Sequence, residues 1–208
     1  MTNIWFTSDH HFGHRRIVEY AKRPFADTVS MDEALVQNWN LYVRPGDLVY
    51  HLGDFAFIRP DEISPLVRRL NGVIHLVHGN HDRFLRDKRR ELSFAWVGPY
   101  KEIKVADQKI VLCHYPFLTW NGRHHGSWDL HGHCHASLPD DPGSKRLDIG
   151  VDAVALRLGK HPEDYRPMEY QEVEVEMQKK GINPVDHHEL RGGDDEEADR
   201  NPANPSEV

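Results

Sequence analysis

The sequence has 208 residues, of which 38% are hydrophobic, and a formal net charge of −7 at pH 7. This length fits one α/β domain with a sizeable core, and the negative charge argues against a general affinity for nucleic acids. No apolar stretch is long enough to span a bilayer, no secretion signal is recognisable and two cysteines make no disulfide framework, so we expect a cytoplasmic protein without a membrane partner.

The first half of the chain alternates between strand and helix patterns. Strands are predicted at residues 3–7, 48–52 and 73–77, and helices at 14–21, about 30–44 and 60–70. The second of these helices is expected to begin at a capping box of Ser30 and Glu33 and to end before Pro45. This order indicates a mostly parallel sheet with right-handed crossovers.

The second half predicts shorter β elements, a helix and a tail. Strands at 101–105 and 109–113 flank Asp107 and Gln108, which suggests a hairpin. Further β segments are expected at 128–130 and 147–149, and a last helix at 170–180. From residue 184 the chain is polar, acidic and contains proline, so we predict a domain over 1–183 and a disordered tail over 184–208.

Polar residues cluster where successive strands are predicted to end. These clusters are Asp9-His10-His11, Gly53-Asp54, Gly79-Asn80-His81-Asp82, Cys113-His114 and His131-Gly132-His133-Cys134-His135. Ligands of open α/β sheets gather at the carboxyl edge of the strands, so these five segments are expected to meet. An extended backbone sends residues i and i+2 to one face, which would bring Asp9 and His11 together, pair His133 with His135 and turn Cys134 away.

The side chains in these clusters predict a site for two divalent metal ions. The candidate ligands are Asp9, His11, Asp54, Asn80, His114, His133 and His135. One tetrahedral ion needs about four protein ligands, and a carboxylate can bridge two ions. The mixture of carboxylate, amide and imidazole suits Mn²⁺, Fe or Zn²⁺ better than Ca²⁺ or Mg²⁺. Two such ions are the usual device for displacement at phosphorus.

The same motifs, in this order, resemble the calcineurin-like metallophosphoesterase superfamily, in its small single-domain bacterial or phage form. The likeness covers residues 9 to 135, with Asp-x-His at Asp9, Gly-Asn-His-Asp at Gly79 and Gly-His-x-His at Gly132. It implies an α/β (α+β) fold in which a two-layered β-sandwich is flanked by helices.

The resemblance also implies a role for each matching residue. Asp9, His11 and His135 would bind the first metal, Asp54 would bridge, and Asn80, His114 and His133 would complete the second site. His81 resembles the family's catalytic histidine, which assists the leaving oxygen, and Asp82 would orient it. The implied reaction is attack of a metal-bound hydroxide on phosphorus, with Mn²⁺ the expected metal and Fe, Zn²⁺, Ni²⁺ or Mg²⁺ as alternatives.

Several residues near the motifs keep two interpretations. Asp82 could instead cap a helix that begins near Arg83. Substrate contacts are expected from His14, Arg15, Asn121 and His125, although the last two could belong to a solvated loop. His10 and His131 are expected to lie beside the ligands without binding metal. The basic run of Arg83, Arg86, Lys88, Arg89 and Arg90 is either a solvated helix face or a patch that steers phosphate.

The expected function is a metal-dependent phosphoesterase that cleaves a small phosphorylated or nucleotide-like substrate, with phosphodiesters preferred over monoesters. Two alternatives remain. A nuclease would need a basic groove, and a non-catalytic scaffold on the same fold would need no complete ligand set. The sequence does not predict an oligomeric state.

Overall fold

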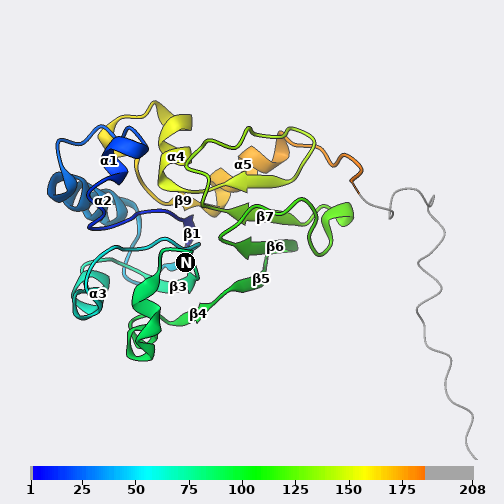
Figure 1. The fold of residues 1–208 in the computed structure, drawn as a ribbon. Helices are drawn as coiled ribbons and strands as arrows, with labels where there is room; N and C mark the ends of the chain where they lie inside the picture. The colour runs from blue at the N-terminus through cyan, green and yellow to red at the C-terminus, as the bar shows by residue number, and fades with distance from the viewer. Residues whose placement is uncertain (1, 186–208) are drawn as a thin grey trace, which may run out of the picture.

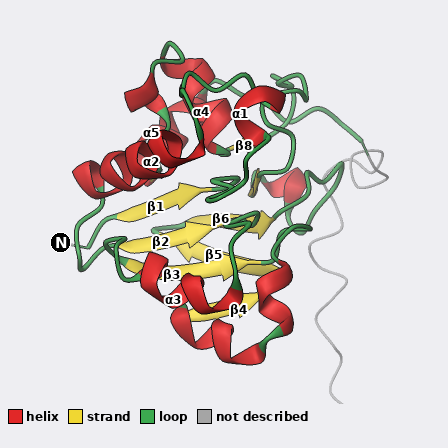
Figure 2. Cartoon of the chain, turned by 60° about the vertical axis from the view of Figure 1, so that its left-hand side comes forward, coloured by secondary structure: helices red, strands yellow, loops and turns green. Residues whose placement is uncertain are grey.

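In the computed structural model, which describes residues 2–185, two β-sheets pack face to face and are flanked by helices (Figures 1 and 2). The first sheet has the order β4-β3-β2-β1-β9. Its strands are β1 (Ile4–Thr7), β2 (Leu48–His51), β3 (Val73–Val77), β4 (Trp96–Gly98) and β9 (Met168–Glu169). Strands β1 to β4 are parallel, and β9 pairs with β1 in the antiparallel sense. The predicted parallel sheet is therefore confirmed.

The second sheet has the order β5-β6-β7-β8. Its strands are β5 (Tyr100–Val105), β6 (Gln108–Cys113), β7 (Trp128–His131) and β8 (Arg146–Asp148). The hairpin prediction is confirmed, because β5 and β6 are antiparallel with Val105 opposite Gln108. Strands β6, β7 and β8 are parallel, so they end at the same edge. Two packed sheets with outer helices confirm the two-layered sandwich implied by the resemblance.

Five α-helices and four short 3₁₀ helices accompany the strands within residues 2–185. The α-helices are α1 (Ile17–Tyr20), α2 (Thr28–Tyr42), α3 (Pro60–Val67), α4 (Val151–Leu158) and α5 (Tyr170–Gln178). The 3₁₀ helices are η1 (Arg83–Arg86), η2 (Lys88–Ser93), η3 (Arg123–His125) and η4 (Pro162–Asp164). Helix α4 and strands β4 and β9 were not predicted from the sequence. No helix among residues 2–185 is both long and apolar enough to cross a membrane.

The predicted start of α2 is wrong by one turn. The Asp27 carboxylate accepts a 2.7 Å hydrogen bond from Ser30 N, and the Ser30 hydroxyl accepts a 3.2 Å hydrogen bond from Asp27 N. Asp27 is therefore the N-cap, and Ser30 occupies the third helical position of the same capping box.

Alternate residues of the first sheet contribute to two separate cores. Trp5, Val49 and Leu76 face the helix layer, where they join Met31, Leu35 and Trp39 of α2 and Ile63 of α3. Their neighbours Phe6, Tyr50 and Val77 face the second sheet and meet Ile110, Leu112, Trp128, Leu130 and Leu147. This period of two fixes the register of each strand, because a slip by one residue would exchange the two faces. The predicted tail lies outside the described residues, apart from its first two positions.

Candidate metal centre

The ends of four strands, two from each sheet, bring predicted ligands together as two adjacent groups. The first donor group is Asp9, His11 and His135, and the second donor group is Asp54, His114 and His133. Within each group, one ligand atom of every residue lies within 4.8 Å of the others. Asp9 and His11 follow β1, Asp54 follows β2, His114 follows β6, and the remaining two follow β7. The strand-end interpretation therefore places these residues correctly.

The local geometry that produces the convergence differs from the prediction. The backbone is left-handed, with φ of 59° at Asp9, 54° at His11, 55° at Asp54, 70° at His133 and 46° at His135. Such angles are uncommon for residues with a side chain, and they concentrate at functional sites where the surroundings impose them. His133 and His135 consequently turn to different donor groups, whereas an extended strand would have pointed both the same way.

In the first donor group Asp9 and His11 are buried, His135 is half-buried, and Asp9 and His11 each have a buried polar side-chain atom without a hydrogen-bond partner. His11 Nε2 and His135 Nε2 are 3.2 Å apart, and each lies 3.9 Å from Asp9 Oδ1. Asp9 Oδ1 is buried without a hydrogen-bond partner, and burial raises the pKa of this carboxyl well above its usual value. Burial also disfavours the charged form of His11 and so lowers the pKa of its ring. A buried carboxylate with a free oxygen beside two imidazoles fits a divalent cation, which would supply the missing partner.

Asn80 completes the second donor group. Its Oδ1 lies 2.8 Å from His114 Nε2 and 3.0 Å from His133 Nδ1. Burial is the main cause that lowers the pKa of His114, which favours the neutral ring that can bind metal. The structure thus brings all seven predicted ligands to one place.

Asp54 belongs to the second donor group but lies between a histidine of each group. Its Oδ2 is 3.5 Å from His11 Nε2 and 3.6 Å from His114 Nε2, while its Oδ1 accepts a 2.8 Å hydrogen bond from His81 N. The carboxylate is therefore fixed by the loop after β3 and presents one oxygen to both groups. This position fits a bridging ligand.

A buried ion pair, absent from the sequence predictions, stands behind His135. Asp152 Oδ2 lies 2.6 Å from His135 Nδ1, and the Asp152 carboxylate accepts two hydrogen bonds from Arg23, at 2.9 and 2.7 Å. Arg23 also donates to the carbonyls of Asp9 and His10, at 2.6 and 2.8 Å. Asp152 lies in α4 and no motif marks it, so the sequence gives no signal of its position.

Asp82 holds backbone rather than His81. Its carboxylate accepts hydrogen bonds from the amides of Gly79, Asp54 and Phe55, at 2.8, 3.0 and 2.8 Å. Among the described residues, the side chains of Asp82 and His81 share no hydrogen bond, and Asp82 gives no side-chain cap to η1. Both interpretations offered from the sequence therefore give way to a third, in which Asp82 ties the loop after β3 to the loop after β2. Burial raises its pKa to about 7.

His81 and His14 lie at the rim of the site, and both rings pack against Phe57. The Phe57 ring centroid is 4.0 Å from that of His14 and 4.9 Å from that of His81. The His11 ring lies 5.5 Å from His14 and 5.8 Å from His81. Both histidines are half-buried, so each is placed where a group bound at the donor atoms could contact it.

The other predicted substrate contacts lie elsewhere. Asn121 donates to Glu102, and exposed His125 belongs to η3, next to Gly126, whose carbonyl accepts from Gln108. Gln108 begins β6, and the six residues from there to His114 span about 20 Å at the usual strand rise. This loop is thus at the opposite end of the second sheet from the donor groups. Exposed Arg15 lines a separate cavity with Glu19 and Asp27.

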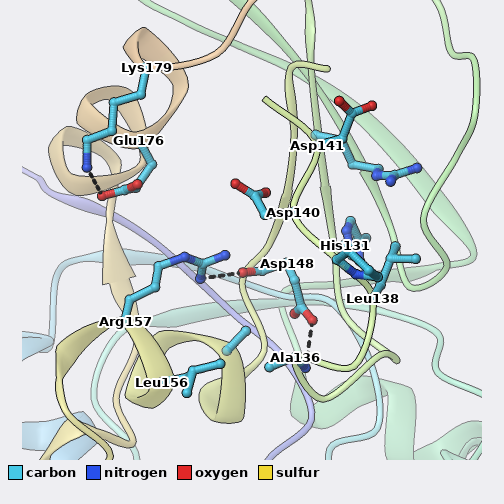
Figure 3. Close-up of a pocket in the computed structure, with 13 residues that line it drawn as sticks. His131, Ala136, Leu138, Asp140, Asp141, Asp148, Leu156, Arg157, Glu176 and Lys179 are labelled. Atoms are coloured by element: carbon cyan, nitrogen blue, oxygen red, sulfur yellow. Dashed lines mark hydrogen bonds and ion pairs between the residues drawn. The ribbon is translucent and has the colours of Figure 1, made fainter. Parts of the chain in front are cut away.

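A cavity of about 470 Å³ lies beyond β8, between α4, α5 and the loop at 136–141 (Figure 3). His131 lines this cavity and belongs to neither donor group, and its Nδ1 is 2.9 Å from the carbonyl of Gly132. Figure 3 shows Arg157 bonded to the backbone oxygen of Asp148, and Lys179 paired with Glu176. His10, as expected, contacts another buried histidine, His51, at 3.0 Å. Cys134 is a free thiol outside both groups.

Two glycines permit the close approach of the loops. A Cβ on Gly132 would stand 2.4 Å from Asp9 Oδ2, and one on Gly79 would stand 2.3 Å from Asp54 Oδ1. Real Cβ atoms do not approach heavy atoms so closely. The two carboxylates can therefore take these positions only because both neighbours lack a side chain.

Comparison with known proteins identifies the family and agrees with the fold. The profile of the calcineurin-like phosphoesterases matches residues 2–155. The chain is 32% identical over 161 residues to protein MJ1445 of Methanocaldococcus jannaschii, covering 74% of this chain and 84% of that one. It is 29% identical over 184 residues to the gene 66 protein of Mycobacterium phage L5, covering 74% and 88%. The solved structure of protein AQ665 from Aquifex aeolicus has a TM-score of 0.62 at 23% identity, covering 84% of this chain and 99% of that one.

The chain belongs to the calcineurin-like phosphoesterase family. The family, together with two groups of His and Asp side chains able to hold divalent ions, defines a metal-dependent phosphoesterase. Such enzymes are hydrolases that act on phosphorylated substrates.

Proposed function

We propose that this protein is a phosphodiesterase that uses two divalent metal ions, with Mn²⁺ as the preferred metal. The observation that carries the proposal is the position of Asp54, whose Oδ2 lies about equally far from a histidine of each donor group, at 3.5 and 3.6 Å. One carboxylate oxygen shared between two sets of ligands is what a pair of neighbouring ions requires.

The two ions would be held by different side chains. Asp9, His11 and His135 would hold the first ion, Asn80, His114 and His133 would hold the second, and Asp54 would bridge. When bound, the ions would supply Lewis acidity to the phosphoryl group and lower the pKa of water. The mixed oxygen and nitrogen donors favour Mn²⁺, with Fe, Zn²⁺, Ni²⁺ and Mg²⁺ as alternatives.

His81 would provide the proton for the leaving oxygen. Its amide is tied to Asp54 Oδ1 at 2.8 Å and its ring packs against Phe57, so its backbone is fixed to the bridging residue while the half-buried ring faces the rim. A diester releases an alkoxide, which is a poor leaving group unless a general acid protonates it, so a retained histidine favours diester cleavage. His14, which also packs against Phe57, would contact the substrate.

Several groups that touch no substrate would orient the ligands. The second ring nitrogen of His135 bonds to Asp152, and that of His114 bonds to the carbonyl of Leu52 at 2.8 Å. Such partners set the tautomer and the direction of the metal-binding nitrogen. Asp82 would act in the same way on the backbone, because its three amide contacts hold Asp54 and Gly79 together.

The proposal is tested by hydrolysis of bis-p-nitrophenyl phosphate and p-nitrophenyl phosphate by metal-stripped protein. Mn²⁺, Mg²⁺, Zn²⁺, Ni²⁺ or buffer alone would be added back. We expect diester turnover that requires metal and is fastest with Mn²⁺. We expect Asp54→Ala to abolish activity on both esters. We expect His81→Ala to reduce kcat by about 10²–10⁴-fold for a dinucleotide, which releases an alkoxide, and far less for bis-p-nitrophenyl phosphate, whose p-nitrophenolate leaves without a general acid.

His125→Ala is the matched control, because this exposed histidine is at the far end of the second sheet and should leave turnover unchanged. Metal-independent turnover, or full activity of Asp54→Ala, would contradict the proposal. Faster hydrolysis of the monoester would overturn the preference for diesters while leaving the metal site intact.

A further inference from the structure

We infer that a cavity beside Asn80 binds a second phosphate group of the substrate. The preferred substrates would then be phosphodiesters with another phosphate close to the scissile one, as in oligonucleotides and in esters of nucleoside diphosphates. This inference rests on the proposed function, because it assigns the cavity to a substrate bound at the metal centre.

The cavity has a volume of about 360 Å³ and begins at the candidate metal centre. Asn80 lines it and also contacts His114 and His133 of the second donor group. From there the lining continues through Arg83 and Arg86 to Lys88. A ligand in the cavity would therefore adjoin one held at the second donor group.

The two arginines are presented on the same side of a short helix. Arg83 and Arg86 are the first and last residues of the 3₁₀ helix η1, in which side chains three residues apart eclipse each other. Phe84 and Leu85, between them, are buried in the core and anchor the helix. The two guanidinium groups are thus exposed above a fixed backbone.

Nearby carboxylates are already engaged, so they do not neutralise these arginines. Asp87 pairs with Arg89 at 2.9 Å and with Arg90 at 3.3 Å, and Glu91 pairs with Lys88 at 2.5 Å.

Asp82 also lines the cavity, but both of its oxygens accept hydrogen bonds from backbone amides. Within residues 2–185, neither Arg83 nor Arg86 forms an ion pair. The cavity therefore has two free cations and no free carboxylate.

Phosphate is the anion that this lining fits best. A guanidinium group presents donors in a fixed planar fork that matches two oxygens of a phosphate, and it keeps its charge at any working pH. In a chain with a net charge of −7, two arginines without ion pairs that line one cavity beside Asn80 give this place a local positive charge. The basic run thus divides into arginines available to substrate and arginines that balance Asp87.

The inference is tested with a matched pair of chromogenic diesters. These are the p-nitrophenyl ester of thymidine 5′-phosphate and the same compound with an added 3′-phosphate, which places a second phosphate across one sugar as an oligonucleotide does. ADP-ribose is the other arm, because its second phosphate is directly bonded to the scissile one. Bis-p-nitrophenyl phosphate, with no second phosphate, reports the basal activity.

We expect the 3′-phosphate or the diphosphate to raise kcat/KM by about tenfold, mainly through KM, since a charge-assisted hydrogen bond contributes about that factor. The double variant Arg83→Ala, Arg86→Ala should lose this preference and keep the basal rate, and the preference should weaken as NaCl rises. Arg89→Ala, whose guanidinium is paired with Asp87 and lies outside the cavity lining, should behave as the wild type.

Two results would overturn the inference. The first is an equal kcat/KM for the two matched esters together with no gain for ADP-ribose over bis-p-nitrophenyl phosphate. The second is a double variant that keeps the preference for the second phosphate. Failure of the proposed function would look different, because the wild type would then not hydrolyse even bis-p-nitrophenyl phosphate. A gain in only one arm would support the inference and identify the spacing of the two phosphates.

Discussion

The carboxylate of Asp152 lies 2.6 Å from Nδ1 of His135 and joins this candidate ligand to the buried guanidinium of Arg23. Burial acts to raise the pKa of Asp152, but Arg23 and His135 outweigh it and hold the pKa at about 2. The carboxylate is therefore ionised at neutral pH, and its bond to Nδ1 leaves Nε2 of His135 facing Asp9 and His11. A carboxylate behind a metal-binding histidine also raises the basicity of the ring.

We predict that Asp152→Ala loses both stability and metal affinity. Removal of one partner leaves Arg23 buried without its counter-charge, which typically costs about 3–5 kcal/mol in the free energy of unfolding. Metal affinity should fall by about 10–100-fold because His135 is no longer oriented. Urea unfolding of the metal-free protein and calorimetric titration with Mn²⁺ measure the two effects separately.

Asp61→Ala is the comparison for that variant, because Asp61 is exposed and its pairing with Arg59 should contribute less than about 1 kcal/mol. If Asp152→Ala were as stable as Asp61→Ala and bound Mn²⁺ as tightly as the wild type, Asp152 would have no positioning role.

The number of bound ions should respond differently to two substitutions. Asn80→Ala removes a ligand of the second donor group only, so we expect one ion to bind normally and the other weakly. Asp54→Ala removes the oxygen that both groups share, so both ions should bind weakly. Metal analysis after dialysis, with titration calorimetry, gives the stoichiometry, and a wild type that binds one ion would refute the dinuclear assignment.

Gly132→Ala should displace Asp9. The added Cβ would stand 2.0 Å from Ser8 Oγ and 2.4 Å from Asp9 Oδ2, so the loop after β7 must move. We expect a loss of about 1–3 kcal/mol in the free energy of unfolding, as for other overpacked sites, and weaker metal binding. Gly46→Ala is the control, because its Cβ would have no neighbour within 4 Å, and its stability should stay close to that of the wild type. Equal melting temperatures for the two variants would argue against the close approach.

Asp129 should make the metal-free protein less stable as the pH rises. Its Oδ1 is buried without a hydrogen-bond partner, and burial raises its pKa to about 7, against the opposing effects of Phe117 N and Arg146. The folded state thus favours the protonated acid. The stability that this preference contributes is fully present below pH of about 4 and is lost as the pH rises through 7.

Asp129→Asn removes this charge and should exceed the wild type in stability by about 1–3 kcal/mol at pH 8, with a smaller difference at pH 5. Asp82, whose pKa is also raised to about 7, is present in both proteins and cancels in the comparison. Urea unfolding at the two pH values in metal-free buffer measures the difference, and a difference that does not change with pH would disprove the assignment.

The elements with a clear periodicity could be predicted from the sequence almost to the residue. β3 and the hairpin of β5 and β6 agree with the expected ranges within one residue, because apolar runs and turn signals bound them on both sides. Helix α4 was missed because its N-cap is Gly150, which offers no side-chain cap, and because it begins only three residues after the end of β8. Strand β9 has two residues and carries no pattern of its own.

For the site, the motifs predicted which residues would meet but not how. Left-handed backbone at Asp9 or His133 leaves no trace in hydrophobic periodicity, so the convergence was attributed to extended strands. The residue numbers of Arg23 and Asp152 differ by 129, and their pairing follows from tertiary contacts alone. The loop of Asn121 and His125 was placed at the site because it lies between two ligand segments in sequence, whereas a parallel β6 to β7 connection must return to the opposite edge of the sheet.

The donor groups also have a consequence for the sandwich itself, because each is built from both sheets. Asp9 and His11 follow a strand of the first sheet and His135 one of the second, while Asp54 faces His114 and His133 across the same boundary. Every bound ion would therefore cross-link the two sheets, because its ligands come from strands that are far apart in the sequence. Separation of the sheets and release of metal would then be a single event, and amides of β6 and β7 would exchange hydrogen more slowly with each ion that binds.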